Sequence, residues 1–369
     1  MPKDSGVMWS RREAISLLGA GTGAGLVSLV MGETNLEALR QNSAAIIRTV
    51  LDDVSPEALG TGATLFHEHL SMTDEFVDNL RPPGSPPGTR MKFYDDVDLI
   101  ADEVRAAGED GVACIVDGGH ADMGRSLEAL RHIASRSGVH IVAGGGYYRQ
   151  ATYPPEVATK SEDQLADELV RDARAKRWGA YGEIGTSSTL TADERKMLRA
   201  TGKSHLRTGL AIFTHTPYHS GGCNDGPGGT CAMRQLDAFE SVGVDPQKLC
   251  IGHLSDLDEP SAETAKAIAT RGAFVGFDTV ARPMRGDALP EAKKLHMVLA
   301  VLEAGHEDRV LLSEDLGDKN WLKSVGGSGY SSVVTVFVPK LRYAGVNEAT
   351  IQKLLVDNPR RFLAFVPKA

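Results

Sequence analysis

Six ionisable side chains that suit a transition metal stand at the ends of short apolar runs of the sequence. They are His67 and His69 in ATLFHEHL, Glu183 in GAYGEIGTS, His215 in LAIFTHT, His253 in LCIGHLSD and Asp315 in RVLLSEDLG. Four imidazoles and two carboxylates match the ligands that zinc and similar divalent ions take in proteins. One such run would mean little, but five of them predict a common metal site, and the ligand number favours a pair of ions.

Residue type and spacing predict a role for individual members of this set. His67 and His69 are two residues apart, so on a strand they point the same way and can share one ion, whereas Glu68 between them points to the opposite face and is expected to be structural. Glu183 is the best candidate for a carboxylate that bridges two ions. Asp315 could bind one ion and also hydrogen-bond to a bound hydroxide, a position that suits a catalytic base or proton carrier.

Secondary-structure elements must bring these side chains to one place, and the sequence contains eight apolar runs that could form such elements. The apolar runs lie at 63–69, 113–119, 140–146, 179–185, 210–216, 249–255, 273–279 and 309–315. Between them lie amphipathic stretches such as DDVDLIADEVRAAGEDG and GRSLEALRHIASRSG, which are typical of helices. Eight buried strands alternating with helices predict an α/β fold, a (β/α)8 TIM barrel with its functional groups at the carboxyl ends of the strands.

A doubly wound open sheet is the alternative to the barrel. It lacks support because no G-x-G-x-x-G follows the first apolar run, and the glycine-rich GAGTGAG lies near the N-terminus. Residues 46–60 predict a short pair of strands before the barrel. The stretch NEATIQKLLVDNPRRFLAF predicts a closing C-terminal helix that an Asn-Pro pair stops, followed by an apolar tail. No internal repeat appears, so residues 34–369 are expected to form one catalytic domain.

The first 33 residues differ in character from the rest. Ser10, Arg11 and Arg12 precede an uncharged, glycine-rich stretch from Ala14 to Met31, which predicts a twin-arginine export signal. The twin-arginine translocation machinery would then be a partner, and the protein would be periplasmic or secreted. The absence of a clear A-x-A site leaves open that an uncleaved segment anchors the protein to the membrane.

Composition excludes several other partners. With 369 residues and 41% hydrophobic residues the chain can bury a large core, and its net charge of −9 argues against nucleic acid or an anionic membrane surface. A small-molecule substrate is expected. The sequence offers no interface evidence, so a homodimer stays open.

The four cysteines fall into two pairs. Cys114 and Cys250 lie inside apolar runs and are expected to be small buried hydrophobic residues. Cys223 and Cys231 flank a Gly/Pro-rich loop, GGCNDGPGGTCAM, and in an oxidising compartment a disulfide between them is favoured over two free thiols.

From about Ile46 to the C-terminus the chain resembles the phosphotriesterase family of the amidohydrolase superfamily. The stretches that carry the resemblance include GATLFHEHL, IVDGGHADMGRS, GVHIVAGGGYY, RVLLSED and LLVDNPRRFL. The resemblance implies two divalent ions, zinc first, with manganese, cobalt or iron left open. It implies a buried ion on His67, His69 and Asp315, a more exposed ion on His215 and His253, and a hydroxide and Glu183 shared between the ions.

The resemblance also implies residues around the ions. Asp256 matches a second carboxylate on the proton path, with a helix-capping aspartate as the alternative, and Tyr148 matches an aromatic residue beside the leaving group. Asp278 and Thr279 fall in the substrate pocket where relatives have Asp-Arg or Asp-His, so Thr279 lacks the expected pocket base.

Two features limit the choice of substrate. Glu183 stands where the best-known phosphotriesterases and their lactonase relatives carry a carboxylated lysine, which places the chain nearer a glutamate-bridged branch. Arg282 and Arg285 could supply positive charge to an anionic substrate, although solvated loop arginines are the simpler interpretation.

We therefore predict a metal-dependent hydrolase in which a hydroxide bridging two divalent ions attacks a lactone, carboxylic ester, amide or phosphoester, with a carbonyl favoured. The alternative is an exported barrel that binds a metal or ligand without turnover.

Overall fold

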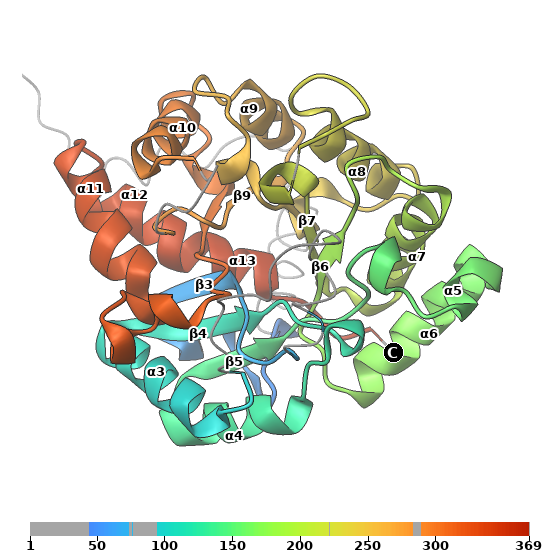
Figure 1. Cartoon of the computed structure of the whole chain (residues 1–369), viewed down its shortest axis with the longest axis horizontal. Coiled ribbons are helices and arrows are strands. Elements are labelled where there is room, and N and C mark those ends of the chain that lie inside the picture. Colours follow the sequence, from blue (N-terminus) through green and yellow to red (C-terminus); the bar gives the residue numbers. More distant parts are fainter. Residues whose placement is uncertain (1–43, 74–75, 77–93, 221, 283–288, 369) are drawn as a thin grey trace, which may run out of the picture. The chain divides into compact units, whose positions relative to one another are not determined.

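The computed structural model describes residues 44–73, 76, 94–220, 222–282 and 289–368 of the chain (Figure 1). The predicted export signal at residues 1–33 lies outside the described residues. The chain divides after Ala45, and the unit from Ile46 to Ala369 carries the elements below. Among the helices in the described ranges, none is both long and apolar enough to cross a membrane.

Eight parallel strands follow one another along this unit and coincide with the eight predicted apolar runs. They are β3 (Ala63–Glu68), β4 (Val112–Asp117), β5 (His140–Ala143), β6 (Ala180–Gly185), β7 (Ala211–His215), β8 (Leu249–Ile251), β9 (Phe274–Phe277) and β10 (Val310–Leu312). Several strands are shorter than the runs that predict them, because the chain leaves the sheet before the functional residue at the end of the run.

The strands pair in sequence order in two arcs. One arc is β3-β4-β5 and the other is β6-β7-β8-β9-β10, with parallel pairing throughout. Backbone hydrogen bonds join the arcs, among them Gly179 N to Ala143 O at 2.9 Å and Gly182 N to Gly145 O at 3.0 Å on one side, and Asp315 N to His67 O at 3.1 Å on the other. This is the predicted (β/α)8 barrel.

Helices follow the strands and surround them in Figure 1. Two of them begin at capping boxes, which Ser161 forms with Gln164 and Thr191 forms with Glu194. The helices are α3 (Val97–Glu109), α4 (Leu127–Ser137), α5 (Glu156–Thr159), α6 (Glu162–Ala175), α7 (Ala192–Thr208), α8 (Thr230–Glu240), α9 (Glu263–Thr270), α10 (Glu291–Glu303), α11 (Val338–Tyr343), α12 (Glu348–Gln352) and α13 (Asn358–Leu363).

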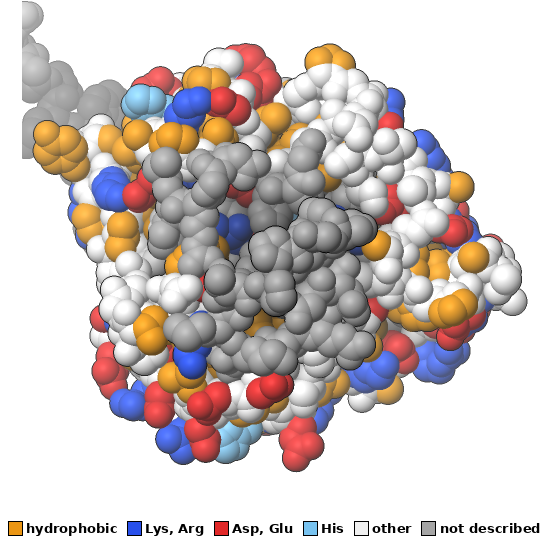
Figure 2. Space-filling view, in the orientation of Figure 1, with side chains coloured by type: hydrophobic (Ala, Val, Ile, Leu, Met, Phe, Trp, Pro, Cys, Tyr) orange, Lys and Arg blue, Asp and Glu red, His pale blue; other side chains and the backbone are white. Residues whose placement is uncertain are grey.

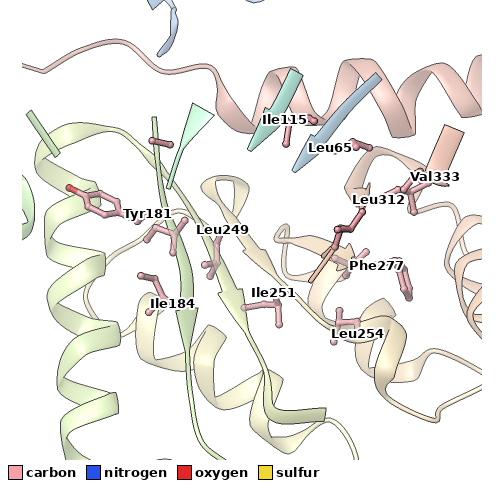
Figure 3. Close-up of a cluster of buried hydrophobic side chains, with 14 of the residues drawn as sticks. Leu65, Ile115, Tyr181, Ile184, Leu249, Ile251, Leu254, Phe277, Leu312 and Val333 are labelled. Carbon is pink, nitrogen blue, oxygen red and sulfur yellow. The ribbon is translucent and has the colours of Figure 1, made fainter. Parts of the chain in front are cut away.

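Two apolar layers hold the barrel together. Alternate strand residues such as Cys114, Phe213 and Cys250 form an inner cluster, and both cysteines are buried free thiols, as predicted. Residues between them in the strands face outward and pack against the helices. Figure 3 labels members of this outer cluster, among them Leu65 and Leu312 from strands and Val333 from the C-terminal helical region. Because the period of a strand is two, each strand serves both layers.

The two ends of the unit meet. The predicted strand pair is present as β1 (Ile47–Arg48) and β2 (Asp53–Val54), which are antiparallel, and Ile46 bridges Phe365. The predicted helix stop at Asn358-Pro359 is wrong. A π-helical turn (Lys353–Asp357) continues directly into α13, with Pro359 in its first turn, where a missing N–H interrupts no bond within the new segment.

The surface around the barrel mixes charges of both signs. Figure 2 shows acidic and basic side chains interspersed around the edge of the face that it presents. Cys223 in the loop after β7 forms a disulfide with Cys231 in the first turn of α8, with Cα atoms 5.8 Å apart.

Candidate metal centre

The structure brings all six predicted ligands together at the carboxyl ends of the strands. His67, Glu183 and His215 lie within β3, β6 and β7, and the other three lie one to three residues beyond β3, β8 and β10. All six are buried, from 0% exposure for His67 to 8% for Asp315. Water therefore solvates few of these ionisable groups, and they depend on one another or on a bound ion.

One group of ligand atoms gathers around Asp315 Oδ1. His69 Nε2 lies 3.1 Å from this atom and 3.1 Å from Glu183 Oε1. His67 Nε2 lies 3.8 Å from Asp315 Oδ1 and 3.3 Å from Glu183 Oε2. Ligands at zinc–nitrogen distances in a tetrahedron stand about 3.4 Å apart, so this spacing fits one divalent ion.

A second group lies on the other side of Glu183. His215 Nδ1 is 2.7 Å from Glu183 Oε2 and 2.6 Å from His253 Nε2. His253 Nε2 is 3.7 Å from the same carboxylate oxygen. Glu183 thus stands between the two groups, with Oε1 toward His69 and Oε2 toward His215. This is the arrangement expected of a carboxylate shared by two ions.

An unpaired ligand nitrogen and the local electrostatics are both consistent with a metal site. His67 Nε2 is buried and has no hydrogen-bond partner within the described part of the chain. Burial lowers the pKa of His69, but Asp315 and Glu183 outweigh burial and raise that pKa to about 9. The same competition raises the pKa of His253 to about 10, with Asp278 as the largest opposing influence. The concentrated carboxylates therefore favour positive charge at this site, and the residues are able to hold divalent metal.

Two ligands occupy unusual backbone positions. His253 has φ of 57° and Asp315 has φ of 50°, both in the left-handed region that non-glycine residues seldom adopt. Strain of this kind persists where the surrounding structure fixes it. Gly252, next to His253, has no room for a side chain because a Cβ atom would collide with Thr214 O on β7. The close approach of the two strands thus sets the position of His253.

Asp278 lies behind the ligands and orients two of them. Its Oδ2 accepts a hydrogen bond from His67 Nδ1 at 2.9 Å, and its Oδ1 accepts from His253 Nδ1 at 3.0 Å and from His253 N at 2.8 Å. Burial opposes ionisation, but His253 and His67 hold the pKa of Asp278 well below its usual range. The carboxylate is fully buried and bonded to protein groups, so it does not present a free oxygen to a substrate pocket.

Glu68 fixes the loop that carries Asp315. One carboxylate oxygen accepts hydrogen bonds from Ser313 Oγ at 2.7 Å and from Glu314 N at 2.8 Å, and the other accepts from Leu316 N at 2.9 Å. Burial raises the pKa of Glu68 to about 7. The residue between the two histidines is therefore structural, and it ties the end of β3 to the end of β10.

Tyr148 touches the second ligand group. Its hydroxyl lies 3.0 Å from His215 Nε2, and the two rings meet edge to face at 4.8 Å between centroids. Its backbone N–H donates to Asp122 Oδ2 at 3.0 Å, which fixes the loop after β5. An aromatic side chain thus borders the second ligand group, and the role beside a leaving group that the resemblance implies for Tyr148 stays a prediction.

Thr279 and Asp256 form a pair beside the ligands. Thr279 is fully buried, and its hydroxyl donates to Asp256 Oδ1 at 2.9 Å. Lys294 on α10, which sequence reasoning missed, donates to the carbonyl and the hydroxyl of Thr279. The Thr279 hydroxyl thus forms its hydrogen bonds with other groups of the protein. The only sequence signal for Lys294 is its place beside Lys293 in EAKKLHM, and this pattern does not separate the two lysines.

Arg282 lies next to Asp315. Its guanidinium bonds the carboxylate and the backbone carbonyl of Asp315 and stacks over the Trp321 ring at 5.1 Å. Its Nε is buried and lacks a hydrogen-bond partner among the residues that the structure describes. Arg282 is therefore a cation at the site and not a solvated loop residue, whereas Arg285 lies outside the described residues.

Comparisons with known proteins agree with this geometry. The N-acetyltaurine hydrolase of Bos taurus is 28% identical, with 86% of this chain and 98% of the relative covered. The phosphotriesterase homology protein of Escherichia coli is 32% identical, with 82% and 98% covered. Its crystal structure, with phosphate in the active site, matches at a TM-score of 0.72 and 29% identity over 82% of this chain and 99% of that chain.

One similar solved structure bears a binding title. A resiniferatoxin-binding protein from Rhodobacter sphaeroides matches at a TM-score of 0.76 and 29% identity, over 87% of this chain and 95% of that chain. The model of the phosphotriesterase family matches residues 46–363, which span the whole barrel and all six ligands. The chain belongs to the phosphotriesterase family and is a hydrolase of that class.

Proposed function

We propose that the protein is a binuclear metal hydrolase that cleaves a carboxylic amide or ester. The observation that carries this proposal is the position of Glu183, whose two oxygens face the two ligand groups. When bound, two divalent ions, zinc in the first instance, supply Lewis acidity that lowers the pKa of a water molecule and polarises a carbonyl oxygen.

The protein's own residues orient the reactants and move protons. Asp315 accepts the proton that the attacking water loses, since its carboxylate lies within the first ligand group. Asp256, which accepts a hydrogen bond from Thr279 next to Asp278, is the second acceptor. Tyr148, buried against His215, borders the leaving group and excludes water on that side.

The choice of an amide or ester rests on the relatives and on Arg282. Relatives that cover most of the chain are N-acetyltaurine hydrolases, whose named substrate is an amide with an anionic sulfonate. Arg282 places a cation beside Asp315, and its Nε–H has no acceptor within the described ranges. A substrate with an anionic group next to the scissile amide or ester would meet both requirements.

A second candidate is a barrel that binds a ligand without turnover. The similar structure titled as a resiniferatoxin-binding protein favours it. The complete ligand set weighs against it, because a binding protein has no need to keep both ligand groups and the shared Glu183.

Metal analysis and a substrate panel separate the two candidates. We expect about two equivalents of divalent metal per chain. We also expect hydrolysis of one or more members of a panel of N-acyl amino acids, N-acetyltaurine, lactones and carboxylic esters, with slower cleavage of phosphotriesters. Asp315→Asn should abolish hydrolysis while the second ligand group still holds metal. A metal-free protein that binds panel compounds tightly without turnover would favour the binding candidate, and full activity of Asp315→Asn would refute the mechanism.

We also propose export by the twin-arginine route. The Cys223–Cys231 disulfide supports it, since such bonds persist in oxidising compartments. Replacing Arg11 and Arg12 by lysine should retain the protein in the cytoplasmic fraction, and unchanged periplasmic recovery would contradict the proposal.

A further inference from the structure

Lys294 lies in the first turn of α10 and is fully buried. Both circumstances disfavour an ammonium group, because burial removes its water and the helix N-terminus carries partial positive charge. Its neighbour Lys293 instead points outward and pairs with Asp258 at 2.7 Å. A buried cation in this position requires specific partners, and it marks a candidate for a functional role.

The partners of Lys294 are at the end of β9 and in the loop after β8. Its Nζ donates to Thr279 O at 2.6 Å and to Thr279 Oγ1 at 3.0 Å, and it lies 3.5 Å from Asp256 Oδ1. Burial lowers the pKa of Lys294, and the carboxylate of Asp256 opposes this effect. The charges of Arg282 and Glu314 also act on the ammonium, in opposite directions.

These contacts saturate the Thr279 hydroxyl. It donates to Asp256 Oδ1 at 2.9 Å and accepts from Lys294, and Ser255 Oγ lies 2.8 Å away as a second donor. A hydroxyl has one proton to donate and two lone pairs, so its capacity is filled and its direction is fixed. Thr279 therefore transmits the position of Lys294 to Asp256.

Asp256 is held by one oxygen only. Oδ1 faces Thr279 and Lys294, whereas Oδ2 is buried and without a hydrogen-bond partner in the described part of the structure. An orphaned carboxylate oxygen is costly, so it is expected to meet a donor during function. Asp256 ends the short helical turn that begins directly after His253, and its partner Thr279 directly follows Asp278, which bonds His253.

We propose that Lys294 is a positioning residue that fixes Asp256 so that its free oxygen Oδ2 accepts a hydrogen bond or proton from the substrate amide or the leaving group. The inference rests on the proposed function, in which Asp256 serves the reaction. Lys294 itself touches no substrate and acts through Thr279 and Asp256.

The test compares four variants with the metal-loaded wild-type enzyme on its best panel substrate. Lys294→Met should lower kcat about ten- to a hundredfold with KM within about twofold, because misplaced acceptors slow the reaction while uniform binding persists. Lys294→Arg should restore most of kcat. Asp256→Asn combined with Lys294→Met should be no slower than Asp256→Asn alone, since both act on one step.

A matched control removes another lysine that bonds backbone carbonyls. Lys248 donates to Arg361 O at 2.9 Å and to Phe362 O at 3.3 Å, before β8 and thus at the opposite end of the strand from His253. Lys248→Met should leave kcat unchanged. Metal content, measured for every variant, should stay at the wild-type level. If Lys294→Met does not fold, Thr279→Val interrupts the same contact and should lower kcat in the same way.

Two measurements, kcat and the free energy of unfolding, separate the positioning role of Lys294 from the proposed function. Losses that multiply in the double variant, or a Lys294→Met enzyme with wild-type kcat, would overturn the positioning role. The contact is also tested without an activity assay, by comparing the free energy of unfolding of the two single variants and the double variant. If the effects of Lys294→Met and Asp256→Asn on this free energy are additive, the two residues are not coupled and the positioning role is overturned as well. A wild-type enzyme that hydrolyses nothing in the panel, with this coupling intact, would refute the proposed function and with it the catalytic part of the proposal.

Discussion

Asp278 Oδ2 accepts a hydrogen bond from His67 Nδ1 at 2.9 Å, and this single contact decides which nitrogen of His67 faces the metal centre. With Nδ1 protonated and bonded to Asp278, Nε2 is left as the ligand atom. The other oxygen of Asp278 does the same for His253 in the second group. One buried carboxylate thus fixes the tautomer of a ligand in each of the two groups.

Asp278→Asn should weaken binding of both ions. An asparagine offers one acceptor where two imidazole N–H groups need one each, so at least one ring loses its orientation. We expect metal affinity to fall about 10- to 100-fold, measured by titration of metal-free protein with zinc. Asp172→Asn, which removes only the exposed pair with Lys176, serves as the control. Equal affinity in wild type and Asp278→Asn would show that the orientation is set elsewhere.

A second prediction concerns Glu68. In Glu68→Gln the side-chain amide donor faces a backbone N–H of Glu314 or Leu316, which now lacks an acceptor. Leaving such a group unpaired in the core costs about 1–3 kcal/mol. We expect the free energy of unfolding to drop by this amount, together with weaker metal binding because the Asp315 loop shifts. Denaturant unfolding of the metal-free protein measures the first effect, and an unchanged midpoint would contradict it.

The barrel was predictable because buried parallel strands are apolar on both faces. Such strands appear in sequence as continuous runs, and each run places its last ionisable residue at the carboxyl end of the barrel. The six candidate ligands follow from this rule, and the structural role of Glu68 follows from the alternation of side chains along a strand. The same rule could not locate the ends of the strands, since His253 and Asp315 leave the sheet through left-handed backbone positions that the sequence does not mark.

The surroundings of the site depend on contacts between distant segments. Asp278 was expected in the substrate pocket, but its two oxygens serve histidines from β3 and the loop after β8. Lys293 and Lys294 are adjacent and identical in sequence, yet about 100° of helix rotation makes one exposed and the other buried. The Asn358-Pro359 pair looked like a helix stop, but a π-helical turn before it absorbs the change.

The Cys223–Cys231 disulfide should stabilise the loop after β7. A crosslink across this short segment, with a sequence separation of 8, restricts the unfolded chain by roughly 2.5 kcal/mol in the chain-entropy model. We expect the Cys223→Ser, Cys231→Ser protein to melt several degrees lower under oxidising conditions and to equal the reduced wild type. If dithiothreitol leaves the wild-type Tm unchanged, the bond does not stabilise the fold.

His205 should make the fold sensitive to acid. It lies buried in the last turn of α7, and its Nδ1 donates to Leu210 O at 2.7 Å. Burial lowers the pKa of His205 below its usual value of 6.5, although the Leu210 carbonyl opposes this effect. The unfolded chain therefore binds a proton more readily than the folded protein does. Stability from the neutral imidazole is complete above pH 6.5, and it is lost as the pH falls through that value toward the folded-state pKa.

His205→Gln keeps a donor for Leu210 O but cannot titrate. We expect the loss of Tm between pH 7.5 and pH 5.5 to be smaller in this variant than in the wild type, by on the order of 2 °C. The ligand histidines titrate equally in both proteins, so the difference between the two slopes isolates His205. If Tm falls by the same amount in both proteins across this pH range, the folded protein tolerates a charged imidazole at this position.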